Sequence, residues 1–187
     1  QDGYKFLNPQ YEKVTKIVKV ESLRYNYLLK YINENNFNIN DKKILILGDY
    51  DFDINLRLIN IILKSNNCDK KNIFFKPHPA SIKKNKFDNI NYIYEPVEKI
   101  INAFSTIITS TSTAASLEFL IIGKKVCIYD DTFSLDLSPV KQYNDFFYRF
   151  KNSKEIDNLL LNNSNIEKNK IKFRNYYYLD LNLSMWK

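Results

Sequence analysis

The sequence predicts an α/β fold, in which a mainly parallel, doubly wound sheet is covered by helices on both faces. Short, unbroken apolar runs recur along the 187-residue chain, and such runs are typical of strands that are buried on both sides. Segments with apolar residues at helical spacing lie between these runs. Strands that alternate with helices favour a parallel sheet, because the crossover between two parallel strands is usually a helix.

The first elements are a helix, a strand and a second helix. Residues 11–34 carry apolar side chains at helical spacing, and the polar residues 35–40 close that segment. The apolar run 44–47 predicts the first parallel strand, which ends at Gly48. Asp53 is expected to cap the next helix, which has a broad apolar stripe.

The same alternation continues through the rest of the chain. Further strands are predicted over residues 73–75, 92–94, 106–109 and 126–129, with an edge strand over 146–148. Further helices are predicted over residues 97–104, 113–122 and 153–161, followed by a polar, aromatic helical tail that ends at Trp186. The order of elements predicts a Rossmann-like domain over residues 41–187. We expect residues 1–40 to form a helical segment that connects this domain to another one.

Scarce residue types exclude several classes of protein. Glycine occurs at only three positions, so neither a GxGxxG dinucleotide fingerprint nor a GxxxxGK[ST] phosphate loop is present. One histidine and two well-separated cysteines leave no HExxH motif, zinc cluster or disulfide scaffold. We therefore predict that the protein uses no metal and no cofactor.

The net charge of +7 (28 basic minus 21 acidic residues) is compatible with an anionic partner. The lysines are scattered among residues with AT-rich codons, however, and no zinc-finger or RNP signature is present, so we predict no nucleic-acid partner. Peripheral contact with an anionic membrane stays open. Since no apolar run of 18 residues and no signal-peptide core is present, we expect the protein in the cytoplasm or at the inner face of the cell membrane.

Polar residues directly after strands are the first candidates for a functional site, because ligands bind at the carboxyl ends of the strands in doubly wound sheets. Three such segments stand out: Gly48-Asp49-Tyr50, Lys76-Pro77-His78-Pro79 and Ser110-Thr111-Ser112-Thr113.

The second segment holds the only histidine of the chain between two prolines. Proline restricts the backbone on both sides of His78, so its imidazole is presented by a rigid turn. Such a ring can donate a hydrogen bond to a phosphate oxygen, and Lys76 adds positive charge nearby. The alternative is a turn that ends the strand and carries an incidental histidine.

The third segment places four hydroxyl groups at the start of a predicted helix, where backbone N–H groups and the helix dipole favour an anion. Glu118 lies about one and a half turns into this helix and can accept hydrogen bonds from ribose hydroxyls. The alternative is ordinary capping of the helix by Ser112 or Thr113, with Glu118 solvated on an outer face.

Several acidic residues follow strands as well. We expect Asp49 to face the ligand, and Asp51 and Asp53 to cap the next helix. A calcium loop is not predicted from these three residues, since the glycine and the downstream glutamate of an EF-hand are missing. The pair Asp130-Asp131 follows another strand and either forms a turn or approaches the same site.

The chain contains the segment FFKPHPAS and, later, the segment TSTSTAASLEFLIIGKKV. In this order the two segments resemble the donor-binding half of GT-B glycosyltransferases that build bacterial surface polysaccharides. They are most similar to the sialyltransferase, polysialyltransferase and Kdo-transferase-like groups, which use CMP-activated sugars and carry an HP motif and a Ser/Thr-Ser motif. The segments VESLRYNYLL and YYYLDLNLSMWK are also similar to this class, so the resemblance extends from about Val20 to Lys187.

The resemblance implies a nucleotide-sugar donor, with a CMP-sugar favoured, and a glycan acceptor. It implies that His78 is catalytic and lies with Pro79 at the donor phosphate. The remaining donor-binding residues would be Ser110, Thr111 and Ser112 at the phosphate or the cytidine, Glu118 at the ribose, and Lys76, Thr113, Gly48 and Asp49 nearby.

The general base of such enzymes usually lies in an acidic-Asp-Gly motif of the other, N-terminal domain. Here only Gln1-Asp2-Gly3 is present, with glutamine in place of the first acid, and the chain does not begin with methionine. We therefore expect a fragment that lacks the N-terminal GT-B domain and binds the donor without turning it over alone.

Two other functions stay open. A glycerol-phosphate or ribitol-phosphate transferase that uses a CDP-alcohol is one, since such families share an HP-type motif and a serine-rich helix start. The other is a non-catalytic α/β binding or assembly module, basic enough to lie against an anionic membrane or glycan.

Overall fold

A parallel sheet of six strands, in the order β3-β2-β1-β4-β5-β6, forms the centre of the protein. The computed structural model describes residues 22–33, 42–81, 87–88, 90–136, 146–161 and 182. Within them the strands are β1 (Ile44–Leu47), β2 (Ile73–Lys76), β3 (Asn91–Tyr92), β4 (Thr106–Ser110), β5 (Lys125–Tyr129) and β6 (Tyr148–Phe150). This strand order is that of a doubly wound Rossmann-like sheet, and it confirms the predicted fold class.

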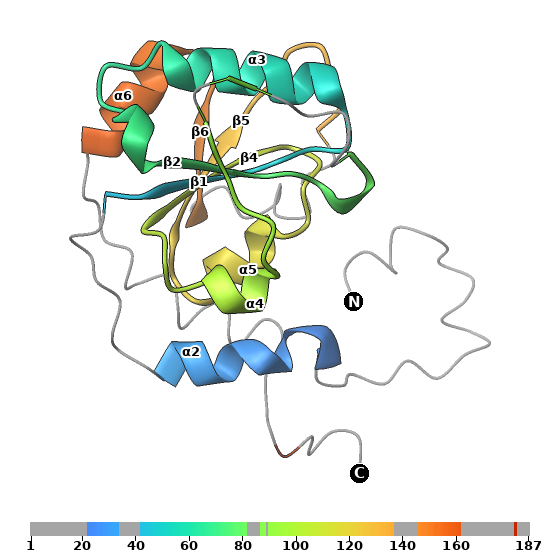
Figure 1. The fold of residues 1–187 in the computed structure, drawn as a ribbon. Helices are drawn as coiled ribbons and strands as arrows, with labels where there is room; N and C mark the ends of the chain where they lie inside the picture. Colours follow the sequence, from blue (N-terminus) through green and yellow to red (C-terminus); the bar gives the residue numbers. More distant parts are fainter. Residues whose placement is uncertain are drawn as a thin grey trace.

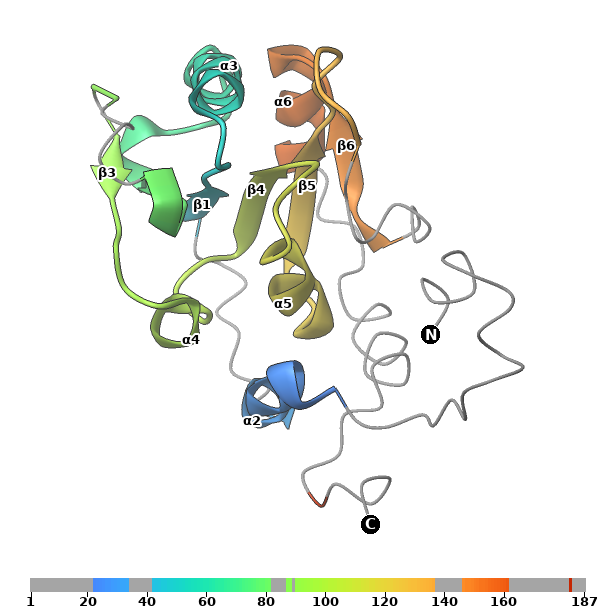
Figure 2. The same cartoon turned by 90° about the vertical axis from the view of Figure 1, so that its right-hand side faces the viewer.

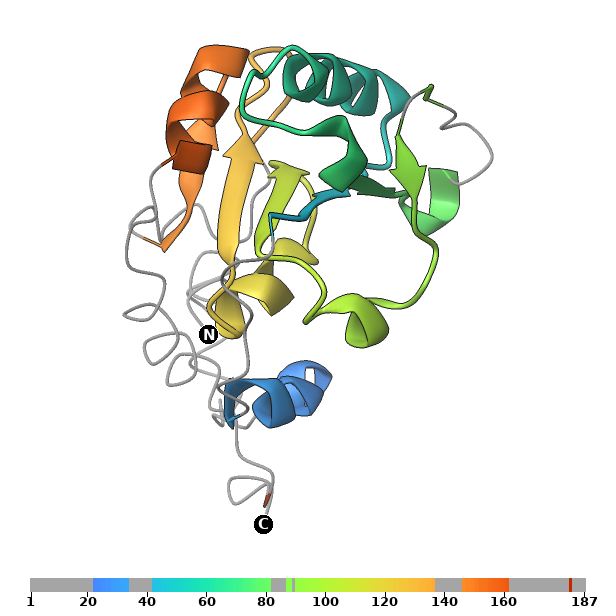
Figure 3. The same ribbon diagram turned by 60° about the vertical axis from the view of Figure 1, so that its left-hand side comes forward.

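Helices cover both faces of the sheet. Helices α3 and α6 pack on one face, and α4 and α5 on the other, with α2 lying outside α5 (Figures 1 and 2). Figure 3 shows the same layers from another side. The helices are η2 (Leu23–Leu28), α2 (Leu29–Asn33), α3 (Phe52–Leu63), η3 (Lys70–Asn72), η4 (Pro79–Ser81), α4 (Val97–Ile100), α5 (Ser116–Ile121) and α6 (Ser153–Leu161).

Alternating residues of each central strand feed two apolar cores. In β1, Leu45 and Leu47 belong to the core shared with α5, whereas Ile44 and Ile46 belong to the core shared with α3. All four side chains are buried. Because successive side chains of a strand point to opposite faces, a strand covered on both sides must be apolar at every position. This explains the unbroken apolar runs of the sequence.

The N-terminal helical segment packs on the outside of the α5 layer. The described part of the predicted helix over 11–34 begins with the 3-10 helix η2 and continues as α2, while residues 11–21 lie outside the described residues. Tyr25, Leu28 and Leu29 are buried in the core shared with α5. Leu23, which was expected on the inner face, is 52% exposed, because η2 winds more tightly than the predicted α-helix.

Local hydrogen bonds shift several predicted boundaries. Asp51, not Asp53, is the N-cap of α3, and its side chain accepts a hydrogen bond of 2.8 Å from the Asp53 backbone. The edge strand β6 begins two residues later than predicted, after the buried Phe147. Helix α4 ends at Ile100, four residues earlier than predicted, because the chain turns there to enter β4.

Helix α5 begins at Ser116, three residues after the predicted start. Its N-cap, Ala115, has no side chain that can cap, and the Ser116 hydroxyl donates a 2.8 Å hydrogen bond to the Thr113 carbonyl. The helix ends at Ile121, one residue before the predicted end, and Ile122 is its C-cap. Gly123 follows with a φ of 80°, a left-handed conformation that favours glycine after a helix, as predicted.

Other predictions concern residues outside the described ranges. The aromatic tail after residue 161 is described only at residue 182, and the division of the chain at residue 40 falls in the undescribed segment 34–41. Among the described helices, none is both long enough and apolar enough to cross a membrane.

Candidate functional site

The first and third predicted segments meet where the strand order reverses. Strands β1 and β4 are neighbours, with Leu47 paired to Thr109, so the residues after both strands leave the sheet side by side. Asp49 follows β1, and Ser110 is the last residue of β4. The carboxyl edge at such a topological switch point is where doubly wound proteins bind their ligands.

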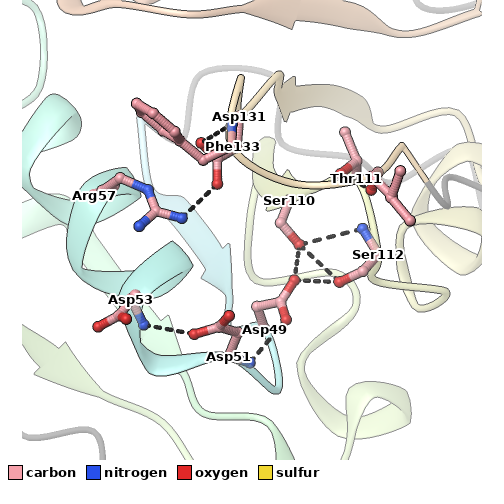
Figure 4. A network of polar contacts seen from close by, with 10 residues as sticks. Asp49, Asp51, Asp53, Arg57, Ser110, Thr111, Ser112, Asp131 and Phe133 are labelled. Atoms are coloured by element: carbon pink, nitrogen blue, oxygen red, sulfur yellow. Dashed lines mark hydrogen bonds and ion pairs between the residues drawn. The ribbon is translucent and has the colours of Figure 1, made fainter.

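A network of hydrogen bonds joins Asp49 to the hydroxyl segment (Figure 4). The Asp49 Oδ2 atom accepts hydrogen bonds from the hydroxyls of Ser110 and Ser112, and Oδ1 accepts one of 2.9 Å from the Asp51 backbone. The Ser110 Oγ atom is also 3.2 Å from Thr113 Oγ1. The structure therefore places predicted site residues from two different strand ends in one polar cluster.

The Asp49 backbone is held by a buried side chain of α3. Asn55 is fully buried; its Oδ1 accepts a 2.7 Å hydrogen bond from the Asp49 N–H, and its Nδ2 donates one of 2.9 Å to the Asp49 carbonyl. The clamp fixes where the chain leaves β1. The sequence analysis missed Asn55, although an amide within the apolar stripe of a helix was a signal, since buried polar groups need partners.

The second predicted segment is tied to the same strand end. The Gly48 N–H donates a 2.8 Å hydrogen bond to the Lys76 carbonyl. The Ser81 hydroxyl lies 3.3 Å from the carbonyl of Asp49 and 3.2 Å from that of His78. The turns after β1 and β2 are thus one connected unit, and the structure brings all three predicted segments to the same edge of the sheet.

The ring of His78 is oriented by its own turn. Its Nδ1 atom accepts a 3.2 Å hydrogen bond from the Ala80 backbone, which selects the neutral tautomer with its proton on Nε2. The ring is half-buried, and Tyr50 meets it edge-on with 6.0 Å between centroids. The turn therefore leaves the Nε2–H group of His78 as the ring's remaining donor.

Lys76 directs its ammonium group to the β3 side of this edge. Its Nζ atom donates a 2.6 Å hydrogen bond to the Glu95 carbonyl. Burial lowers the pKa of Lys76, and the charge of Glu95 acts against that shift. Pro77 is buried and Pro79 is exposed.

The four hydroxyls are not the first turn of a helix, and this corrects the sequence analysis. Residues 111–115 form a turn before α5, so the alternative that Ser112 or Thr113 caps this helix is also wrong. Thr111 is buried, with its hydroxyl 3.4 Å from the Leu135 carbonyl, and Thr113 is half-buried. Ser112 is the one exposed residue of the four.

Glu118 lies against the N-terminal helical segment. It is buried, so the alternative of a solvated outer face is wrong. Its Oε2 accepts a 2.7 Å hydrogen bond from the Tyr27 hydroxyl, and its Oε1 is 3.8 Å from the Arg24 guanidinium. Burial and this hydrogen bond raise the pKa of Tyr27. The ribose contact of Glu118 stays a prediction, and it requires the carboxylate to serve Tyr27 as well.

An ion pair that the sequence analysis missed lies close to the network (Figure 4). Arg57 of α3 donates a 2.6 Å hydrogen bond to the carboxylate of Asp131, which follows β5 and is almost fully buried. This bond raises the pKa of Arg57. Asp131 also accepts a 3.2 Å hydrogen bond from the Phe133 backbone, so it both forms a turn and lies close to the site. The ring of Phe133 is 84% exposed and lies 5.7 Å from the guanidinium.

The carboxylates of Asp49, Asp51 and Asp53 do not converge. Asp49 faces the serines, and Asp51 turns to the backbone of Asp53. In the part of the chain that the structure describes, no three His, Cys, Asp or Glu side chains are grouped so that they could hold a metal ion.

Gly48 permits the close approach of the first two turns. A Cβ atom at this position would lie 2.8 Å from Phe75 Cζ, 3.0 Å from the Lys76 carbonyl oxygen and 3.1 Å from the His78 nitrogen. Since Phe75 is fully buried, it has no room to move aside. We expect Gly48→Ala to lower the free energy of unfolding by about 1–3 kcal/mol, measured by urea denaturation. An unchanged stability would contradict this packing of the turns.

The fold and the hydrogen-bonded edge define a doubly wound α/β protein with a polar cluster at its switch point. In comparisons with known proteins, no protein-family model matches the chain and no curated protein matches it significantly.

Proposed function

We propose that this chain is the donor-binding domain of a glycosyltransferase that uses a nucleotide-activated sugar, with CMP as the favoured nucleotide. One observation carries the proposal: polar segments that follow β1, β2 and β4 are joined by hydrogen bonds at the topological switch point of the sheet. That edge is the nucleotide site of doubly wound folds in general. The resemblance of the HP and Ser/Thr-Ser segments to transferases that use CMP-sugars supports the choice of nucleotide.

His78 is proposed to bind the donor phosphate. Its Nδ1 is occupied by the Ala80 backbone, so Nε2–H is the group that can donate to a phosphate oxygen. During transfer the acceptor oxygen attacks the anomeric carbon, the bond from that carbon to the phosphate oxygen breaks, and CMP leaves with the bonding electrons. A hydrogen-bond donor at the phosphate stabilises the negative charge that develops on it. The proton of the acceptor hydroxyl goes to a base that we assign to a second domain.

A set of nucleotides tests this function through thermal stability. CMP at about a hundred times its Kd should stabilise the fold by about 2.7 kcal/mol, which raises the melting temperature of a chain of this size by about 5–10 °C. CMP-sugars should act similarly. A shift with CDP-glycerol and none with CMP would instead favour the CDP-alcohol transferase.

The absence of a shift with every cytidine and uridine nucleotide would contradict both transferases. Salt dependence provides the control. Binding to an anionic surface by charge alone weakens steeply with ionic strength, whereas hydrogen bonds within a nucleotide site retain much of the affinity.

A further inference from the structure

The hydroxyl hydrogens of Ser110 and Ser112 point towards the carboxylate of Asp49. A hydroxyl group has one hydrogen to donate, and a carboxylate accepts hydrogen bonds without donating any. Because Ser110 and Ser112 both donate to Asp49, neither has a hydrogen left for a ligand. Ser112 is an exposed residue, and its hydroxyl oxygen can therefore offer a ligand only lone pairs.

The charge behind Ser112 is negative. Asp49 is 4% exposed, and its carboxylate accepts from two hydroxyls and one backbone N–H group. Among the described residues, no lysine, arginine or histidine forms an ion pair with it, since Arg57 is paired with Asp131 and Lys76 binds a backbone carbonyl. A phosphate group at Ser112 would meet lone pairs backed by a carboxylate, and both repel an anion.

A neutral polyol fits this surface. Its hydroxyl groups donate hydrogen bonds to acceptors, and a carboxylate that polarises those acceptors strengthens each bond. Ribose is the polyol that every nucleotide donor contains. The site thus has two parts: His78 can donate a hydrogen bond to a ligand, and Ser112 can accept one.

We propose that Ser112, oriented by Asp49 and Ser110, accepts hydrogen bonds from the ribose hydroxyls of the nucleotide and does not bind its phosphate. This inference rests on the proposed function, and it makes Ser112 a specificity residue and Asp49 a positioning residue. It assigns the ribose to the end of β4 instead of Glu118, whose carboxylate is engaged by Tyr27.

Titration with CMP and with 2′,3′-dideoxy-CMP, which lacks both ribose hydroxyls, tests the proposal. The wild-type chain should bind CMP about tenfold more tightly than the dideoxy compound, as expected for loss of a hydrogen bond to a charged network. In Asp49→Asn the amide donates to a serine oxygen and turns a serine hydrogen outward. That variant should reduce the preference to about threefold or less, and its affinity for inorganic phosphate should rise.

Two variants keep the test decisive. Ser112→Ala changes an exposed side chain, should leave the fold intact, and should lose the preference for CMP as well. Asp51→Asn removes the same charge two residues away and retains an N-cap, so it should keep the full tenfold preference. Equal affinity of the wild type for both nucleotides, or an unchanged preference in Asp49→Asn and Ser112→Ala, would overturn this inference and leave the proposed function standing. Failure of CMP itself to bind would overturn both.

Discussion

Replacement of Asn55 by alanine should lower the free energy of unfolding by about 2–4 kcal/mol, because it leaves the buried Asp49 N–H without a partner and removes one of the two hydrogen bonds to the Asp49 carbonyl. The Asp49 N–H and carbonyl both bind the Asn55 amide, which is fully buried. The unsatisfied N–H costs about 1–3 kcal/mol, the lost hydrogen bond to the carbonyl costs about 0.5–1.5 kcal/mol, and alanine regains a few tenths through its higher helix propensity. Denaturation with urea measures this loss of stability. The variant should also bind CMP more weakly, because the turn after β1 is then less ordered.

Asn60→Ala is the matched control for this prediction. Asn60 lies on the same helix but is exposed, so the same substitution should change stability by less than about 0.5 kcal/mol. Similar effects of the two substitutions would show that the Asn55 clamp does not order the switch point.

Loss of the His78 ring should reduce CMP affinity by about 10–150-fold in His78→Ala, the effect of one hydrogen bond to a charged group. Isothermal titration measures this loss directly. In the glycosyltransferase that we propose, the same substitution should abolish transfer. The domain should remain folded, because the ring is half-buried at a turn and does not belong to either core.

Two further substitutions separate the turn from the ligand contact. In His78→Asn the side-chain oxygen can still accept from the Ala80 N–H, as in an Asx-turn, but no donor reaches the position of Nε2. In His78→Gln the amide reaches that position. We expect asparagine to preserve stability and lose binding, and glutamine to retain most of the binding. Wild-type affinity of the asparagine variant would remove His78 from the phosphate site.

Periodicity and residue type were enough to predict the fold and the edge of the sheet that holds the candidate site. Strand β1 is apolar at every position because both of its faces are covered, and the unbroken apolar run in the sequence predicted this strand. Since the residues that follow parallel strands emerge at one edge, the sequence also predicted that Asp49, His78 and Ser110 would lie on the same side.

The sequence did not predict which groups of the site donate hydrogen bonds and which accept them. The two serine hydroxyls were predicted to face an anion, but they donate to Asp49, which is more than sixty positions away in the sequence. The clamp by Asn55 and the ion pair between Arg57 and Asp131 also join different elements. Such contacts depend on how α3 lies across the sheet, and spacing along one segment carries no information about them.

The central claim is that the carboxyl edge between β2 and β4 holds a nucleotide, and a crystal structure with bound CMP tests it most directly. We expect a phosphate oxygen within about 2.7–3.2 Å of His78 Nε2 and the nucleoside over the ends of β1 and β4. Well-ordered CMP at the opposite edge of the sheet, or on an outer helix face, would contradict the account.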